Sequence, residues 1–239
     1  MFSFIEFLNE AKATQAEEAQ MSSLRNQHSE LKKKHPNGVP MDLGDSEIHH
    51  VTSIAKVKGY PKADAIFHTS DPKVKKYASL KSSNDPKRYR QYGGVSRSKD
   101  MKENPVVKQF AKHLSKTVHD ETSPRHSATL NRENPHHNRL LHQAIFGHDY
   151  GKKHGPNNVD VIHHGDTHIV PHPKVPGAYK LTSKTAYKNG ELPKSVGGEI
   201  VRENSEKQND LGINKSRVFI SPIGHNKIED ITDKVNKTK

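Results

Sequence analysis

The sequence predicts an α/β protein: a small mixed sheet flanked by helices, with an N-terminal helical extension. Two patterns support this class, namely apolar residues at helical spacing in some segments and short β-type apolar runs between turn signals in others. Only 30% of the 239 residues are hydrophobic and 6% are aromatic, so the core must be modest. We therefore expect one domain over residues 41–231, preceded by polar helical sequence and followed by a basic tail at 232–239.

Helices are predicted where apolar residues recur every three or four positions. Residues 1–34 show this spacing at Phe4, Phe7, Leu8 and Ala11 and continue in helix-forming residues. Three more helices are expected at 45–54, 104–119 and 138–148. The last should end at Gly147, because glycine readily adopts the backbone conformation that terminates a helix.

Strands are predicted where short apolar runs are bounded by turn residues. They are expected at 63–68, 76–81, 178–182 and 217–221. The stretch 158–170 resembles a hairpin that turns at Gly165 and Asp166. The segment 120–138 is polar, and irregular structure is expected there. Residues 199–215 are also polar and are expected to form an excursion from the domain.

The charge of the chain favours a polyanionic partner. The formal net charge is +12, and nucleic acid is the commonest partner of such a protein, although a merely soluble basic protein has the same composition. Absence of cysteine excludes disulfides and thiolate metal sites. No apolar run approaches the roughly 18 residues of a membrane span, so no membrane partner is expected. The acidic start is also unlike a secretory signal.

Two candidate strands carry a charged residue near one end. Asp64 lies at the head of 63–68 and Lys81 ends 76–81, so adjacent strands can present both at a shared end. Hydrolysis of a phosphodiester uses a divalent cation that prefers oxygen ligands, and a positive group near the charge that develops on the phosphate. Glu47, on the helix expected before them, is a candidate second carboxylate.

These residues resemble the core of the PD-(D/E)XK nucleases, which have the restriction-endonuclease-like fold. The resemblance spans about residues 45–165 and rests on Glu47, KAD at 62–64, SLK at 79–81 and QYGG at 91–94. It implies a DNA endonuclease dependent on Mg²⁺ or Mn²⁺. It further implies that Asp64 binds the metal, Leu80 binds it through its carbonyl, Glu47 assists and Lys81 is the catalytic lysine.

Ser79 stands where this family usually has Glu or Asp. Branches of the superfamily have a neutral residue there, and an inactive relative would have one too. Gln91, just downstream, is expected to contact the substrate or the active site. The alternative to the enzyme is a non-catalytic DNA-associated internal head protein or another structural virion protein.

Positive charge and tyrosines gather in residues 73–92. Such a run can bind backbone phosphates and stack on exposed bases, although a solvated loop has a similar composition. The expected DNA contacts are Lys73, Lys75, Lys76, Lys87, Arg88, Arg90 and Tyr92. The 18 histidines match no recognised zinc spacing, which favours phosphate contact, surface positions or titration, with a histidine metal site as the alternative.

The first eleven residues, MFSFIEFLNEA, resemble the capsid-targeting peptides of T-even-like tailed bacteriophages. The resemblance implies cleavage between Glu10 and Ala11 by the head-maturation protease and a place in the virion head, among head proteins, or in the host cytoplasm. Losing the two glutamates of residues 1–10 would raise the net charge from +12 to +14. Residues 11–40 would remain as a helical extension and linker. An ordinary helix docking on the domain is the alternative.

Overall fold

A computed structural model describes most of the chain and divides it into two compact units. The described residues are 4–59, 61–81, 91–95, 98–118, 123–205, 211–224 and 228–236, with side chains from residue 15 onward. The first unit comprises Met1–Asp85 and Gly151–Glu191, and the second comprises Pro86–Tyr150 and Leu192–Lys239. The stretch 41–231, expected as one domain, is thus shared between two units, and the chain passes from one to the other three times.

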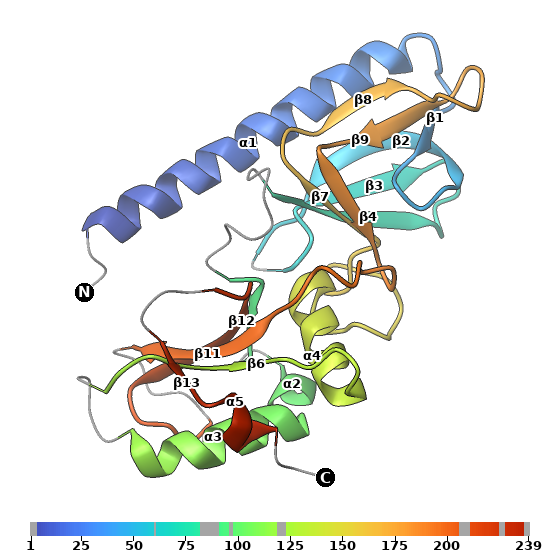
Figure 1. Cartoon of the computed structure of the whole chain (residues 1–239). Coiled ribbons are helices and arrows are strands. Elements are labelled where there is room, and N and C mark those ends of the chain that lie inside the picture. Colours follow the sequence, from blue (N-terminus) through green and yellow to red (C-terminus); the bar gives the residue numbers. More distant parts are fainter. Residues whose placement is uncertain are drawn as a thin grey trace. The chain divides into compact units, whose positions relative to one another are not determined.

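The first unit contains a mixed sheet of eight strands in the order β10-β7-β4-β3-β2-β1-β9-β8 within the described residues (Figure 1). The strands are β1 (Val39–Asp42), β2 (Ile48–Lys56), β3 (Ala65–Thr69), β4 (Lys75–Lys81), β7 (Val161–His164), β8 (His168–Pro171), β9 (Tyr179–Thr182) and β10 (Thr185–Lys188). Strands β1 to β4 form an antiparallel meander, whereas β4 pairs with β7, and β1 with β9, in parallel. The predicted α/β class with a mixed sheet is confirmed.

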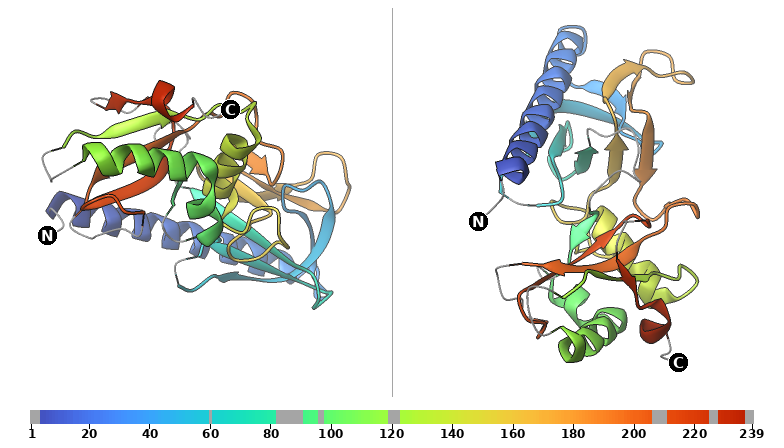
Figure 2. Two further views of the ribbon diagram at one scale, coloured as in Figure 1. Left: turned by 90° about the horizontal axis from the view of Figure 1, so that it is seen from below. Right: turned by 60° about the vertical axis from the view of Figure 1, so that its left-hand side comes forward.

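Helix α1 (Phe4–Lys32) runs along this sheet and contacts β1, β2 and β8 (Figures 1 and 2). Met21 and Leu24 are buried in the core of the unit, together with Phe67 and Leu80 of the sheet. The helix predicted over 1–34 is therefore confirmed. Its second half is an integral part of the first unit rather than a separate extension.

Polar side chains of α1 also bond to the backbone of the sheet. Three of them donate to carbonyls of β2: Arg25 Nε to Ile54 at 3.3 Å, His28 Nε2 to Val51 at 3.0 Å and Lys32 Nζ to Thr52 at 2.9 Å. Gln20 Nε2 donates to the Gly165 carbonyl at 3.0 Å, in the turn after β7. The helix thus fixes both the middle of the sheet and the turn that follows one of its parallel strands.

The second unit has a five-stranded sheet in the order β13-β6-β11-β12-β5 within the described residues. Its strands are β5 (Gly93–Gly94), β6 (His126–Thr129), β11 (Glu199–Asn204), β12 (Ser216–Ser221) and β13 (Glu229–Asp230), and its helices are α2 (Lys99–Glu103), α3 (Pro105–Thr117), α4 (Pro135–Phe146) and α5 (Thr232–Val235). Helices α3 and α4 each begin with an asparagine cap followed by proline, and α4 ends at Gly147, which has a φ of 125°. The helices predicted at 104–119 and 138–148 are confirmed.

The helix predicted at 45–54 is wrong, because these residues enter strand β2. Val51 and Ile54 are both buried, and their separation of three residues imitates a helical face. In the structure the pairing of β2 with β3 shifts between Val51 and Ser53. Such an irregularity, a β-bulge, lets both side chains reach the same face of a strand.

Two other predictions are wrong, one in how its strands pair and the other in its secondary structure. The strands of the supposed hairpin at 158–170 exist, but β7 pairs with β4 and β10, and β8 pairs with β9. The polar stretch 199–215 contains β11, a central strand of the second sheet, and 120–138 contains β6. Strand β11 tolerates its charges because they are paired: Arg202 Nε donates to Ser216 Oγ at 2.7 Å, and Glu203 accepts from Arg125 at 3.2 Å.

No helix in the described part of the chain is long and apolar enough to cross a membrane.

Buried His163 should make the stability of the fold depend on pH. Its Nδ1 lies 3.0 Å from Ser183 Oγ, and burial lowers its pKa to about 4. The unfolded chain, with a histidine pKa of about 6.5, binds a proton first as pH falls. We expect this residue to remove about 2 kcal/mol from the free energy of unfolding between pH 7 and pH 5.

The matched variant is His163→Gln, which cannot titrate. Denaturant unfolding at pH 7 and pH 5 gives the free energy of unfolding at each pH. Between the two pH values, this free energy should fall by about 2 kcal/mol less in the variant than in the wild type. Equal losses in both proteins would contradict the assignment.

Candidate functional site

The β3–β4 hairpin places Asp64 and Lys81 side by side. Asp64 directly precedes β3, and its backbone N–H donates to the Ala78 carbonyl of β4 at 2.9 Å. Lys81, the last residue of β4, brings its Nζ to 3.2 Å from Asp64 Oδ2. Two neighbouring strands thus present an acid and a lysine at one end of the sheet.

One oxygen of the Asp64 carboxylate is saturated and the other is not. Oδ2 accepts from the Leu80 backbone N–H at 2.6 Å and from Ser79 Oγ at 2.9 Å, in addition to the Lys81 ammonium. Oδ1 receives no hydrogen bond from any residue that the structure describes. This second oxygen is the part of the carboxylate that can meet an external ligand.

The Leu80 carbonyl faces the same edge of β4 as Asp64. In a strand, the N–H and C=O of one residue point to one edge, and those of the next residue point to the other. The Leu80 N–H donates to Asp64, whereas the Lys81 carbonyl accepts from Gly165 N, after β7, at 2.7 Å. A carboxylate oxygen and a backbone carbonyl are therefore directed to one edge.

Ser79 is fully buried and adds no negative charge to the site. It shares a face of β4 with Lys81, since alternate side chains of a strand point the same way. Its hydroxyl donates to Asp64 rather than offering a carboxylate. The position where the resembling family usually has an acid is thus occupied by a neutral hydrogen-bond donor.

Sequence reasoning missed two members of the site, Lys62 and His164. His164 of β7 is the register partner of Lys81, so both side chains lie on the same face of the sheet. Its pKa is lowered to about 4 by burial and by the charge of Lys81, so it is neutral at pH 7. His164 stands in HHGD, far from Lys81 in the sequence, and only the parallel pairing of β4 with β7 shows that the two residues are neighbours.

Lys62 approaches the same charges from the segment before Asp64. Although part of its surface is exposed, burial of the ammonium and the charge of Lys81 lower its pKa to about 7, against the opposing effect of Asp64. Among the residues that the structure describes, the site therefore sets one carboxylate against two amines. A divalent cation meets less negative charge here than in a site with two acids.

The expectation that Glu47 assists Asp64 is wrong. Glu47 lies in a loop and joins Asp45 and His49 in a group whose ligand atoms all lie within 4.8 Å of one another. This group could hold a metal ion, and His49 Nε2 is 2.9 Å from Asp45 Oδ2. Lys76, which pairs with Asp45 at 2.8 Å, begins β4, so the group lies roughly 16 Å along the strand from Lys81.

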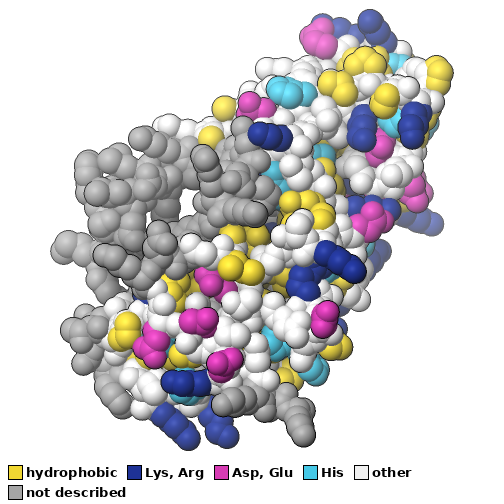
Figure 3. Space-filling model, in the orientation of Figure 1, with side chains coloured by type: hydrophobic (Ala, Val, Ile, Leu, Met, Phe, Trp, Pro, Cys, Tyr) yellow, Lys and Arg dark blue, Asp and Glu magenta, His cyan; other side chains and the backbone are white. Residues whose placement is uncertain are grey.

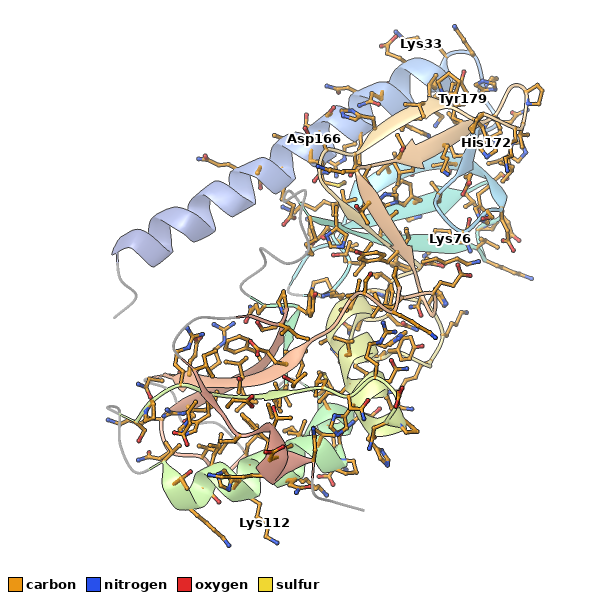
Figure 4. All side chains as sticks on the ribbon, viewed as in Figure 1. Lys33, Lys76, Lys112, Asp166, His172 and Tyr179 are labelled. Atoms are coloured by element: carbon orange, nitrogen blue, oxygen red, sulfur yellow. The ribbon has the colours of Figure 1, made fainter. Side chains whose placement is uncertain are left out.

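The residues predicted to contact DNA have different surroundings. Lys73 and Lys75 are exposed in the first unit, whereas Lys76 is held by Asp45 and Asp160 and is engaged within the protein. Figure 4 labels Lys76 in the first unit and Lys112 on α3. On the face seen in Figure 3, Lys and Arg side chains are interspersed with acidic residues and histidines.

The remaining predicted residues lie in the second unit or outside the described residues. Tyr92 donates from its hydroxyl to the Gly197 carbonyl at 3.4 Å, and Gln91 accepts from Arg217. Both therefore make contacts within the second unit. Lys87, Arg88 and Arg90 lie outside the residues that the structure describes.

Comparison of the chain with models of protein families, with characterised proteins and with solved structures found no match.

Replacing Asp64 should destabilise the first unit. In Asp64→Ala the buried Ser79 hydroxyl and the Leu80 N–H lose their acceptor, and hydrogen bonds to charged groups contribute about 1.5–3 kcal/mol each. We expect the free energy of unfolding, measured with urea, to fall by about 3 kcal/mol.

Asp166→Ala is the matched control, because Asp166 is an exposed aspartate of the same unit (Figure 4). It should change stability by less than about 0.5 kcal/mol. Equal effects of the two substitutions would show that the Asp64 hydrogen bonds do not stabilise the fold.

Proposed function

We propose that this protein is a metal-dependent DNA endonuclease that hydrolyses phosphodiesters at Asp64 and Lys81. The observation that carries the proposal is the 3.2 Å contact between Lys81 Nζ and Asp64 Oδ2, which leaves Oδ1 open to a ligand. The acid-and-lysine hairpin also supports a restriction-endonuclease-like fold for the first unit. The order of the motif residues in the sequence supports the same proposal.

Each residue of the site has a role in this proposal. Asp64 Oδ1 and the Leu80 carbonyl are hard oxygen ligands of the kind that Mg²⁺ and Mn²⁺ prefer. A bound ion of this kind would polarise the phosphate and lower the pKa of an attacking water. Lys81 orients that water or stabilises the negative charge that develops on the phosphate.

Features outside the site support DNA as the substrate and a phage head as the location. The net charge of +12 and the exposed Lys73 and Lys75 favour a polyanion. The N-terminal resemblance supports packaging with head proteins and processing between Glu10 and Ala11. These two residues lie within α1, so the protease would have to open the start of this helix.

A second candidate is a non-catalytic, DNA-associated internal head or structural virion protein. Ser79 favours it, because a buried hydroxyl replaces the family acid, and within the described part of the chain one carboxylate faces two amines. Such a protein would bind DNA through the same positive charges and hydrolyse nothing. The two candidates differ in turnover and in metal affinity, so two measurements separate them.

The first measurement is cleavage of plasmid DNA by the full chain with Mg²⁺, Mn²⁺ or EDTA. Lys81→Met should reduce the cleavage rate by about 100-fold or more, because the group that stabilises the developing charge is lost. Lys112→Met, which removes an exposed lysine of α3, should cleave like the wild type.

Binding without cleavage in either metal would favour the non-catalytic candidate. If Lys81→Met cleaves DNA at the wild-type rate, another site carries the reaction.

The second measurement tests whether the missing acid limits metal binding. Ser79→Asp adds a carboxylate beside Asp64, so like charges should destabilise the variant without metal. With Mn²⁺ the second carboxylate should tighten binding about tenfold, and the melting temperature should rise with Mn²⁺ more steeply than in the wild type.

The Ser79→Asp variant and the protein with Ser79 should both be tested in a His49→Ala background. This substitution weakens the group of Asp45, Glu47 and His49 as a competing metal site. An identical dependence on Mn²⁺ in both would contradict metal binding at Asp64.

A further inference from the structure

A second group of potential metal ligands lies near the start of β4, where Figure 4 labels Lys76. Asp45 and Glu47 are in the loop between β1 and β2, and His49 is the second residue of β2. Their ligand atoms, one imidazole nitrogen and two carboxylate oxygens, all lie within 4.8 Å of one another. The proposed reaction at Asp64 uses none of these side chains.

The distances between the ligand atoms fit one small metal ion. Ligands that lie about 2.1 Å from a tetrahedral ion are separated by roughly 3.4 Å. His49 Nε2 is 2.9 Å from Asp45 Oδ2 and 3.7 Å from Glu47 Oε2, so one separation is slightly shorter than this value and the other slightly longer. Small side-chain rotations are therefore enough to direct all three atoms at one ion.

Two of the three ligands are held in place by the fold. The side chains of Asp45 and His49 are only 10% and 11% exposed, and His49 is in register with Met41 of β1. The second oxygen of Asp45 accepts from the Glu47 backbone N–H at 3.2 Å. Glu47 itself is 71% exposed, so its carboxylate can close over an ion from the solvent side.

Lys76 shows that a cation is already attracted to this group. Its Nζ lies 2.8 Å from Asp45 Oδ2, the oxygen that also faces His49. The same ammonium is 3.6 Å from Asp160 Oδ1, so a second carboxylate is within its reach. Lys76 can therefore leave Asp45 to a metal ion and still keep an acidic partner.

The charge balance around Lys76 also favours a further cation. Among the residues that the structure describes, the carboxylates that act on this ammonium are those of Asp45, Asp160 and Glu47. His154 Nδ1 lies 2.8 Å from Asp160 Oδ1 and adds a second positive charge when it is protonated. A histidine must be neutral to bind a metal, so the three carboxylates outnumber the positive charges when His49 acts as a ligand.

We propose that Asp45, Glu47 and His49 bind a divalent transition-metal ion of the Zn²⁺ type, and that Lys76 then turns from Asp45 to Asp160. The imidazole nitrogen favours this class of ion over Mg²⁺ and Ca²⁺, which prefer oxygen ligands. With three protein ligands, a water completes the tetrahedral coordination. The ion fastens the loop after β1 to β2, and this inference does not depend on the nuclease proposal.

The test is calorimetric titration of the full chain, stripped of metal, with Zn²⁺ and with Mg²⁺. A chelator of known affinity should be present, so that only the tightest site is measured. His49→Gln should weaken Zn²⁺ binding by at least about tenfold, since even partners outside the ligand shell contribute that much. The matched control is His50→Gln, because the exposed His50 points to the other face of β2 and should leave the affinity unchanged.

Lys76→Met tests the exchange between lysine and metal. It removes the ammonium that competes for Asp45, so Zn²⁺ binding should become roughly tenfold tighter. A merely structural ion pair predicts the opposite, because its loss would disorder the ligands. Unchanged or weaker Zn²⁺ binding in Lys76→Met would overturn the exchange.

Glu47→Gln separates loss of folding from loss of binding. Because Glu47 is exposed, the melting temperature of this variant without metal should equal that of the wild type, while its Zn²⁺ affinity falls about tenfold. The inference is overturned if both His49→Gln and Glu47→Gln bind Zn²⁺ like the wild type. It is also overturned if only Asp64→Asn lowers the affinity, which would place the ion at the other site. Equal affinities for Mg²⁺ and Zn²⁺ would contradict the class of ion.

Discussion

The parallel pairing of β4 with β7 is the constraint on which the candidate site depends. Strand β4 receives Asp64 on one edge, from the start of β3, and the turn after β7 on the other, where Gly165 bonds to Lys81. Parallel strands cannot be joined by a tight turn, so a long crossover must connect them. Here the crossover contains residues 86–150 of the second unit.

The two ends of β4 have opposite electrostatic character. Near its start, Lys76 is surrounded by the carboxylates of Asp45, Glu47 and Asp160, so negative charge is in excess. At its end, among the residues that the structure describes, the amines of Lys81 and Lys62 outnumber the one carboxylate of Asp64. The same residue type therefore has two kinds of surroundings: Lys76 pairs with the buried acids Asp45 and Asp160, whereas Lys81 pairs with the single carboxylate of Asp64.

Local patterns predicted the elements better than their partners. Helices α3 and α4 were located from apolar spacing and Gly147, and the hairpin of Asp64 and Lys81 followed from two short apolar runs. The bulge in β2 hid a strand behind helical spacing. Non-local pairing was not predictable from periodicity, so His164 was missed and Glu47 was assigned to the wrong group.

The order in which the strands are made has a consequence for synthesis of the protein. Strand β4 ends at residue 81 and its parallel partner begins at residue 161, so about 80 residues separate the completion of β4 from the start of β7. At translation rates of roughly 5–20 residues per second, the edge of β4 that β7 will cover lacks this partner on the ribosome for roughly 4–16 s. An unpaired strand edge can pair with other chains. The nascent meander β1 to β4 therefore exposes an edge that can pair with other chains until β7 has been made.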